Sequence, residues 1–485
     1  MCNGATRSPA SCFSAGGFSS VRAGKVSLVV LNPARPRLEL ARCMLGIPEK
    51  TQYISTFTAI RAENFESLLY YEVYRNHHEN LRMVKTSQLP AVDRTVPLEQ
   101  ISAFAEKVSI FTDELRETIL APRPRKTAPM FKTGEIAAMC NITHSQVQYL
   151  ATKGDGELPP GTAAGTGRTR TFTLEEARIW VQKVSDIYQT PLVTGTREPD
   201  GKMIITAQLK GGSAKTTTTM CLAQGLTLRG RKVLVVDLDP QASLSELCGL
   251  YAEKDVTPED TVLPYIYDQQ IEGGLAARVQ STYWDGLDVI PAHTELIGAE
   301  FHLPAMQNIK PGFRFWTVLR EGLEPLRKQY DYILMDTSPS LSYMNLNALL
   351  AADSLVMPMV PENLDFISSL SFWRLFSDVS KSFIKYEQGK KYDFISLLLS
   401  RVDYGRTSSA PIVRAWAESA YENWLHAIEV PASSVMSTGA LAFSTVFDVS
   451  SSHSAAKALQ RVRQPLIDYC RWLDEIYEEK WRTAQ

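Results

Sequence analysis

The sequence is poor in the features that would point to a membrane, a disulfide framework or a metal cluster. No apolar run reaches the roughly 18 residues that a transmembrane helix needs, so none is expected. The seven cysteines form no C-x-x-C pair and no regular spacing. This argues against disulfides, zinc and iron–sulfur clusters, and fits a reducing cytoplasm. The formal net charge is −2, so any contact with nucleic acid must come from a local basic patch.

The N-terminal segment has no acidic residue before Glu39 and is rich in Ser, Gly and Arg. That composition resembles a transit peptide. We favour a disordered extension over residues 1–43, ahead of the in-frame Met44, and predict a mainly helical region over 44–121. At the other end, the final helix is acidic around Glu478 and lacks the basic amphipathic face of a membrane-binding tail.

The strict phosphate-loop pattern G-x-x-x-x-G-K-[ST] is also missing, because Leu209 and Ala214 stand where it requires glycine. The segment KGGSAKTT at 210–217 nevertheless has the layout of such a loop. An apolar run at 203–209 predicts a buried strand before it, and a helix is predicted after it at 218–229. A plain Gly-Gly turn with two solvated lysines is the alternative interpretation.

The chemistry of this segment fits a metal–nucleotide site. Backbone N–H groups of such a loop attract an anion, Lys215 adds a positive charge, and the Thr216 hydroxyl can ligate Mg²⁺. Two later apolar runs, VLVV and YILM, predict further buried strands and end in acids: Asp237 and Asp239 after the first, Asp336 after the second. Acids at the carboxyl ends of parallel strands face the ligand crevice.

The segments KGGSAKTT, VLVVDLDPQ and YILMDTSPS, in this order, resemble the ParA/MinD class of deviant phosphate-loop ATPases. Within that class the chain looks most similar to the larger ParA-type partition proteins of low-copy plasmids, the RepA- and SopA-like proteins. The resemblance implies a weakly active ATPase that binds ATP or ADP with Mg²⁺ and forms an ATP-dependent homodimer. It also implies a ParB-type centromere-binding partner. The protein itself would bind nonspecific DNA and operator DNA, repress its own operon, and be cytoplasmic and nucleoid-associated in bacteria.

The resemblance assigns roles at the site. Lys215 would bridge the β- and γ-phosphates, and Thr217 would contact the α-phosphate. Asp239 corresponds to the acid that positions or activates the attacking water. The metal-site residues would be Thr216, Asp237 and Asp336, and the nucleotide-binding residues Gly211, Gly212, Ser213, Ala214, Lys215, Thr216 and Thr217.

Lys210 is the third residue, with Lys215 and Asp239, that we expect to be catalytic. In the family, a lysine at this place reaches across a dimer to the nucleotide of the other subunit, much as an arginine finger does. A solvated loop lysine is the alternative. If Ala214 needs a positive φ, alanine adds roughly 1 kcal/mol of strain there, and we expect slow hydrolysis.

A long apolar stripe lies ahead of the ATPase segments. Apolar residues recur at three- and four-residue spacing over a predicted helix at 96–120. Packing within the chain and the dimerisation that the related proteins imply are equally open.

Residues 127–188 have the pattern of a winged helix-turn-helix domain. A helix, a turn at 140–142 and a second helix capped by Thr143 precede a Gly/Thr-rich wing, and Thr173 with Glu176 predicts a capping box. Residues 121–170 carry seven basic residues against three acidic ones, so the segment is locally basic. The candidate DNA-contacting residues here are His144, Ser145, Gln146, Gln148, Arg168 and Arg170. A helical protein-binding module is the alternative.

A linker is predicted over 189–202, and a ParA-type ATPase domain over 203–480. Further strands predicted at 287–290, 354–360, 394–400 and 427–430 alternate with helices, the pattern of an α/β, doubly wound, mostly parallel sheet. Arg406 resembles a family arginine for nonspecific DNA binding, with a solvated surface charge as the alternative.

Two other functions compete with partition. One is a MinD-like positioning or metal-cluster-delivery ATPase, which the N-terminal module and the absence of clustered cysteines disfavour. The other is a DNA-binding transcriptional regulator with a nucleotide-sensing or degenerate site. Lys210, Lys215, Asp239 and Asp336 together argue against a degenerate site.

Overall fold

The computed structural model describes residues 96–120, 126–153, 157–163, 170–187, 201–251, 254–386, 389–405, 408–436, 443–449 and 456–484. The predicted extension over 1–43, the region up to residue 95 and most of the predicted linker lie outside them. Residues up to Leu115 and residues from Arg116 onward belong to two separate compact units.

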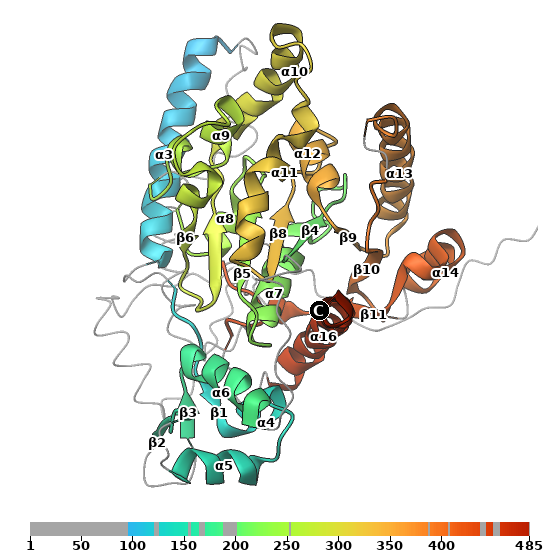
Figure 1. Ribbon diagram of the computed structural model, residues 1–485. Coiled ribbons are helices and arrows are strands. Elements are labelled where there is room, and N and C mark those ends of the chain that lie inside the picture. The colour runs from blue at the N-terminus through green and yellow to red at the C-terminus, as the bar shows by residue number, and fades with distance from the viewer. Residues whose placement is uncertain are drawn as a thin grey trace, which may run out of the picture. The chain divides into compact units, whose positions relative to one another are not determined.

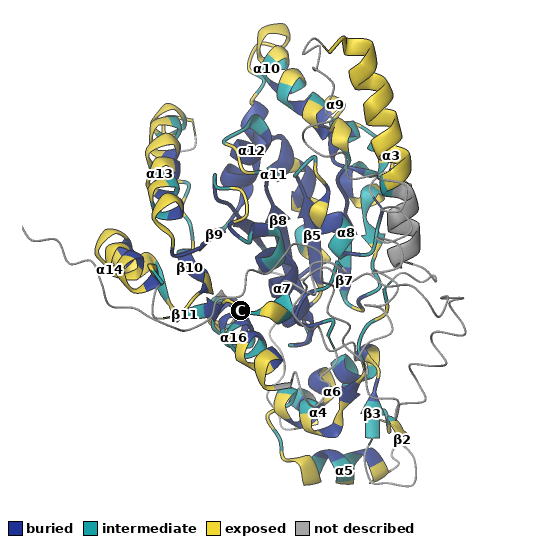
Figure 2. Cartoon of the chain, turned by 180° about the vertical axis from the view of Figure 1, so that it is seen from behind, coloured by how far each residue is buried: buried dark blue, intermediate teal, exposed yellow. Residues whose placement is uncertain are grey.

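Helix α3 (Leu98–Leu120) begins in the first of these units and agrees with the helix predicted at 96–120. Its large apolar side chains are exposed as far as Phe111, with 66% exposure at Phe104 and 52% at Ile101 (Figure 2). The stripe therefore presents an apolar face of the kind that a partner or another part of the chain could cover.

Residues from Arg116 onward contain one eight-stranded sheet (Figure 1). Every strand pairing in it is parallel except the one between β6 and β7. The predicted doubly wound, mostly parallel α/β sheet is thus confirmed. In sheet order the strands are β11 (Leu425–Pro431), β10 (Phe394–Val402), β9 (Ser354–Met359), β4 (Lys202–Thr206), β8 (Tyr332–Asp336), β5 (Val233–Asp237), β7 (Leu287–Ile290) and β6 (Gln280–Ser281).

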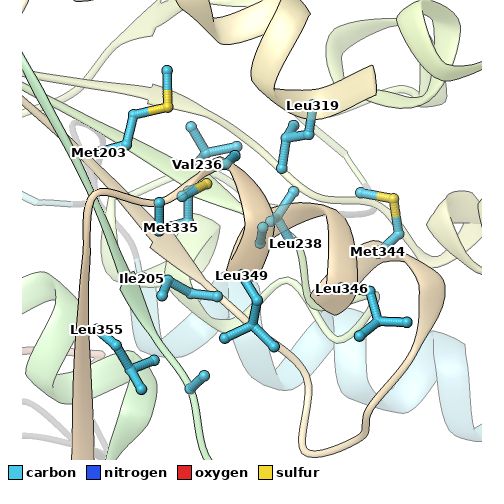
Figure 3. Packing of buried hydrophobic residues seen from close by; sticks show 14 of the residues in the cluster. Met203, Ile205, Val236, Leu238, Leu319, Met335, Met344, Leu346, Leu349 and Leu355 are labelled. Carbon is cyan, nitrogen blue, oxygen red and sulfur yellow. The ribbon is translucent and has the colours of Figure 1, made fainter. Parts of the chain in front are cut away.

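Two apolar clusters cover the two faces of this sheet. Consecutive strand residues point to opposite faces, and in β4 Met203 and Ile205 join one cluster while Ile204 joins the other. Figure 3 shows the first cluster, where Leu319 and Leu349 pack with these strand residues. The helices that contribute to it are α9 (Leu263–Tyr267), α10 (Ala299–Ile309), α11 (Val318–Leu323), α12 (Tyr343–Ala351), α13 (Asn363–Phe383) and α14 (Ala410–Tyr421). Those of the second are α4 (Thr133–Met139), α5 (His144–Lys153), α6 (Leu174–Ile187), α7 (Lys215–Thr227), α8 (Ser243–Leu247) and α16 (Ala456–Ala484).

A smaller group of elements precedes the sheet in sequence. It consists of β1 (Phe131–Lys132), α4 (Thr133–Met139), α5 (His144–Lys153), β2 (Thr162–Ala163), β3 (Arg170–Phe172) and α6 (Leu174–Ile187). The three strands form an antiparallel sheet in the order β1-β3-β2. Its core includes the rings of Phe172 and Trp180, whose centroids are 5.8 Å apart.

Capping explains where the helices of this group begin. The Thr143 hydroxyl accepts a bond from Gln146 N at 3.2 Å, and Thr173 exchanges two bonds with Glu176, so both predicted caps are confirmed. Arg178 of α6 donates to the Arg231 carbonyl at 3.2 Å, which fastens this group to the sheet domain.

Candidate functional site

The loop between β4 and α7 follows the predicted segment closely. Its backbone turns through two left-handed residues, Gly212 at φ 74° and Ala214 at φ 70°. Nothing lies within 4 Å of a Cβ built on Gly212, so glycine is favoured there by the backbone angle rather than by space. Ala214 therefore has the positive φ for which strain was expected, and a non-glycine residue in this conformation costs about 1–2 kcal/mol.

Lys215 is the first residue of α7, and its side chain folds back over the loop. The ammonium donates to the Lys210 carbonyl at 3.2 Å, and the residue is only 7% exposed. Burial lowers the pKa of Lys215, while the charges of Asp336 and Asp239 oppose this change. The loop therefore encloses a cation that faces two carboxylates.

Sheet register brings the two predicted strand-end acids together. Asp336 of β8 lies opposite both Thr206 of β4 and Asp237 of β5. Because parallel strands end at the same edge, both carboxylates reach the edge that carries the loop.

Asp336 has an incomplete set of hydrogen-bond partners. Its Oδ1 accepts from the Thr219 hydroxyl at 3.2 Å, but Oδ2 has no hydrogen-bond partner within the described residues, although the side chain is fully buried. Burial raises the pKa of Asp336 to about 7, and the neighbouring Thr216 side chain and the charge of Lys215 oppose this change. A buried carboxylate oxygen left over beside a threonine hydroxyl fits Mg²⁺, which takes few protein ligands and completes its shell with water and phosphate.

Asp237 is held differently from Asp336. Its Oδ2 accepts from the backbone N and the hydroxyl of Ser245 at 2.9 and 2.8 Å, and its Oδ1 accepts from Asp239 N at 3.2 Å. Burial raises the pKa of Asp237 to about 8, with repulsion from Asp336 as the next cause. These bonds make Asp237 the residue that positions Asp239 and α8; its expected contact with the metal stays a prediction.

The loop opens into a pocket of about 790 Å³, within the range of small-molecule sites. Seven of the predicted residues, from Gly211 to Thr217, line it together with Asp239. Thr219 and Ser245, which hold the two buried acids, were not predicted. The pocket wall also contains residues that the sequence reasoning missed: Arg401, Ala432, Ser433, Ser434, Met436, Phe443, Ser444, Thr445 and Val446.

One signal could have identified Arg401. It directly follows the strand predicted at 394–400, and residues at the carboxyl end of a parallel strand face the ligand edge. The other walls come from irregular segments without periodicity, so no sequence pattern marked them.

The predicted DNA-contacting residues are separate from this pocket. His144 and Ser145 are exposed at the start of α5, and Gln148 is half-buried. The side-chain oxygen of Gln146 already makes local hydrogen bonds, because Oε1 accepts from the backbone N–H and the hydroxyl of Thr143. Arg170 donates to the Pro160 carbonyl at 2.7 Å, which ties β3 to the segment just before β2. Arg168 and Arg406 lie outside the described residues.

The fold and the loop define a phosphate-loop nucleotide-binding α/β protein, and the comparisons with known proteins agree. A family model described as an AAA domain matches residues 201–385. A protein of Sinorhizobium fredii named as a replication protein A is 27% identical over 364 residues, covering 74% of this chain and 89% of its own. Protein SopA of Escherichia coli K12 is 26% identical over 376 residues, covering 74% and 92%. A solved structure titled as a partition protein aligns with a TM-score of 0.52 at 18% identity, over 79% of this chain and 99% of that one, which shows the shared fold.

These matches, with the three motifs in order, show that the chain is similar to ParA-type partition proteins of the phosphate-loop class. Among the helices that the structure describes, none is long and apolar enough to cross a membrane. The same part of the chain contains no group of three or more His, Cys, Asp or Glu side chains arranged to hold a metal.

Proposed function

We propose that the protein is a partition ATPase that hydrolyses ATP with Mg²⁺ to segregate plasmid DNA. The observation that carries the proposal is the buried Asp336 carboxylate with one unpaired oxygen, placed by strand register beside the loop and its buried Lys215. An unpaired buried carboxylate oxygen calls for an explanation, and a cation bound beside the loop would supply one.

The site residues divide the chemistry among them. The N–H groups of the loop and the N-terminus of α7 hold the phosphates, and Lys215 neutralises the charge that develops on them. The Thr216 hydroxyl would hold a bound Mg²⁺ together with Asp336 Oδ2, which would contact the ion directly or through water. The ion would neutralise the remaining negative charge of the phosphates. Asp239 orients the attacking water, and Asp237 fixes Asp239 through its backbone N–H.

Lys210 supplies the link between hydrolysis and dimerisation in this proposal. It is half-buried at the start of the loop, and within its own chain its charge acts on the buried Asp365, opposing the effect of burial on the pKa of that acid. On formation of an ATP-bound homodimer, Lys210 would leave this environment and reach the γ-phosphate of the partner's nucleotide.

The rest of the proposal concerns DNA and partners. The exposed apolar face of α3 supports a dimer contact, and the group of elements from β1 to α6 supports a winged helix-turn-helix domain that binds operator DNA and represses its own operon. Arg406 would contribute to nonspecific binding of nucleoid DNA. A ParB-type centromere-binding partner would stimulate hydrolysis and release the protein from DNA.

The test is ATP hydrolysis by the full-length protein, measured alone, with nonspecific DNA, and with the ParB-type protein encoded beside it. We expect weak basal activity that both additions raise. Lys215→Gln should abolish it, while Lys328→Gln, an exposed lysine ahead of β8, should not change it. A wild-type protein that neither hydrolyses ATP nor changes its DNA affinity with nucleotide would overturn the proposal.

Lys210→Ala provides a second arm of the same experiment. It should still bind nucleotide but lose the ATP-dependent dimer, measured by light scattering, and its hydrolysis should fall at least about 100-fold, as for the loss of a charge-neutralising finger. A normal ATP-dependent dimer in this variant would refute the role of Lys210. Operator binding that persists without any hydrolysis would instead favour a nucleotide-sensing regulator.

A further inference from the structure

The carboxyl end of β10 contains a bulge at Arg401. Between the pairs Leu399–Glu429 and Val402–Pro431, β10 advances by three residues while β11 advances by two, so one residue of β10 is extra. Arg401 lies in this interval with φ 54°, a left-handed angle that an arginine rarely adopts. Bulges and left-handed residues of this kind gather near functional sites, where they redirect a side chain.

The redirected side chain contacts the phosphate loop. Arg401 Nη1 donates to the Gly212 carbonyl at 3.2 Å, across 189 positions of sequence. Arg401 also lines the same pocket as the loop residues Gly211 to Thr217. Because the peptide bond is planar and trans, holding the Gly212 carbonyl toward Arg401 turns the N–H of Ser213 in the opposite direction. The arginine therefore helps to set the orientation of the loop's donors.

Most of the guanidinium remains available to a ligand. A guanidinium has five N–H donors in a planar fork that matches phosphate oxygens, and within the described part of the chain Arg401 makes no further hydrogen bond beyond the one to Gly212. Its charge acts, after that of Lys210, on the buried Asp365. Arg401 and Lys210 thus lie near the same carboxylate.

We propose that Arg401 is a further nucleotide-binding residue, which contacts the terminal phosphate of a bound nucleoside triphosphate while it holds Gly212. The inference rests on the proposed function and adds a cation from the sheet to the two lysines of the loop. Gly212 lies at the end of the loop opposite Thr217, to which the α-phosphate is assigned. A group beside Gly212 therefore meets the far end of the triphosphate, which a diphosphate lacks, and it should discriminate ATP from ADP.

The test compares Arg401→Gly with Arg401→Lys and with Arg374→Ala, an exposed arginine of α13 that lines neither the loop nor its pocket. The affinities for a non-hydrolysable ATP analogue and for ADP are measured by fluorescent-nucleotide titration of the full-length protein, and the melting temperature is measured without nucleotide. Glycine accepts φ 54° without strain, so Arg401→Gly should melt no lower than wild type.

We expect Arg401→Gly to bind the ATP analogue at least about tenfold more weakly, as for the loss of a charge-assisted hydrogen bond, with ADP affinity changed less than about twofold. Arg401→Lys should keep part of the affinity, and Arg374→Ala should resemble wild type. Unchanged triphosphate affinity in Arg401→Gly, or an equal loss for both nucleotides, would overturn the role of Arg401. If wild type binds both nucleotides and Lys215→Gln binds neither, either of these results would refute the role of Arg401 without contradicting the proposed function. If wild type binds no nucleotide, both ideas fail.

Discussion

Replacing Ala214 by glycine should stabilise the protein, although the change removes a methyl group and adds flexibility. Ala214 precedes the first residue of α7 at φ 70° and ψ 25°, and it makes no side-chain cap bond. Relief of the left-handed conformation is worth about 1–2 kcal/mol. The greater freedom of glycine in the unfolded chain offsets about 0.4–1 kcal/mol of this. The net gain in the free energy of unfolding should be about 1 kcal/mol.

The matched control is the same substitution at an alanine with ordinary helical geometry. Ala415 is exposed in the interior of α14, where glycine costs about 1 kcal/mol. Unfolding by urea is followed by circular dichroism without nucleotide, so that ligand binding makes no contribution to stability. Ala214→Gly should then be more stable than wild type, and Ala415→Gly should be less stable. In a domain of this size each kcal/mol should also move Tm by about 2 °C. The reasoning is refuted if Ala214→Gly is less stable than wild type.

Two further predictions concern buried groups away from the loop. Lys126 donates to the carbonyls of Leu247 and Phe443, each at 2.7 Å, and pairs with the buried Asp448 at 3.4 Å. Lys126→Met should therefore lower the free energy of unfolding by about 3 kcal/mol, because a buried acid loses its partner. The control is Lys381→Met, which removes the exposed pair Lys381–Asp378 and should cost less than about 1 kcal/mol. Similar losses in the two variants would contradict this prediction. Burial lowers the pKa of His426 to about 4, against an unfolded value of about 6.5. The unfolded chain binds the extra proton first, so stability should fall by about 1 kcal/mol as pH drops from 6.5 to 4, after allowance for the exposed part of the ring. His426→Phe should flatten that part of a stability-against-pH curve, and an unchanged slope would show that His426 is not its source.

The sheet was largely predictable from the sequence, because buried parallel strands are continuous apolar runs. The strand predicted at 287–290 matches β7 in full, the other predicted strands differ by a few residues at their ends, and the short strand β6 was not predicted. The main error in this domain lies at the start of α7, which begins at Lys215 rather than at residue 218. Ala214 offers no side-chain cap there, so no capping signal was available to place the helix start.

The candidate site was predictable where its residues follow strands and not where they come from irregular segments. Asp336 and Asp239 were found from strand ends, whereas the pocket wall at 432–436 and 443–446 depends on long-range packing that leaves no periodic pattern. Arg401 was not predicted, because the direction of its side chain depends on a bulge. A bulge places two residues of one strand opposite one residue of its partner, and this mismatch cannot be recognised from the sequence of one strand alone.

The burial of Lys126 changes where the ATPase domain should be said to begin. The sequence places its start at residue 203, yet the ammonium of a residue 77 positions earlier lies between α8 and the segment at 443–449, with a side chain only 7% exposed. A fragment cut at residue 201 would keep Asp448 and both carbonyls but lose the cation that satisfies them. For expression of a minimal ATPase domain, Lys126 should therefore be kept although it precedes the elements from β1 to α6, and fragments that begin after it should need a substitute partner for Asp448.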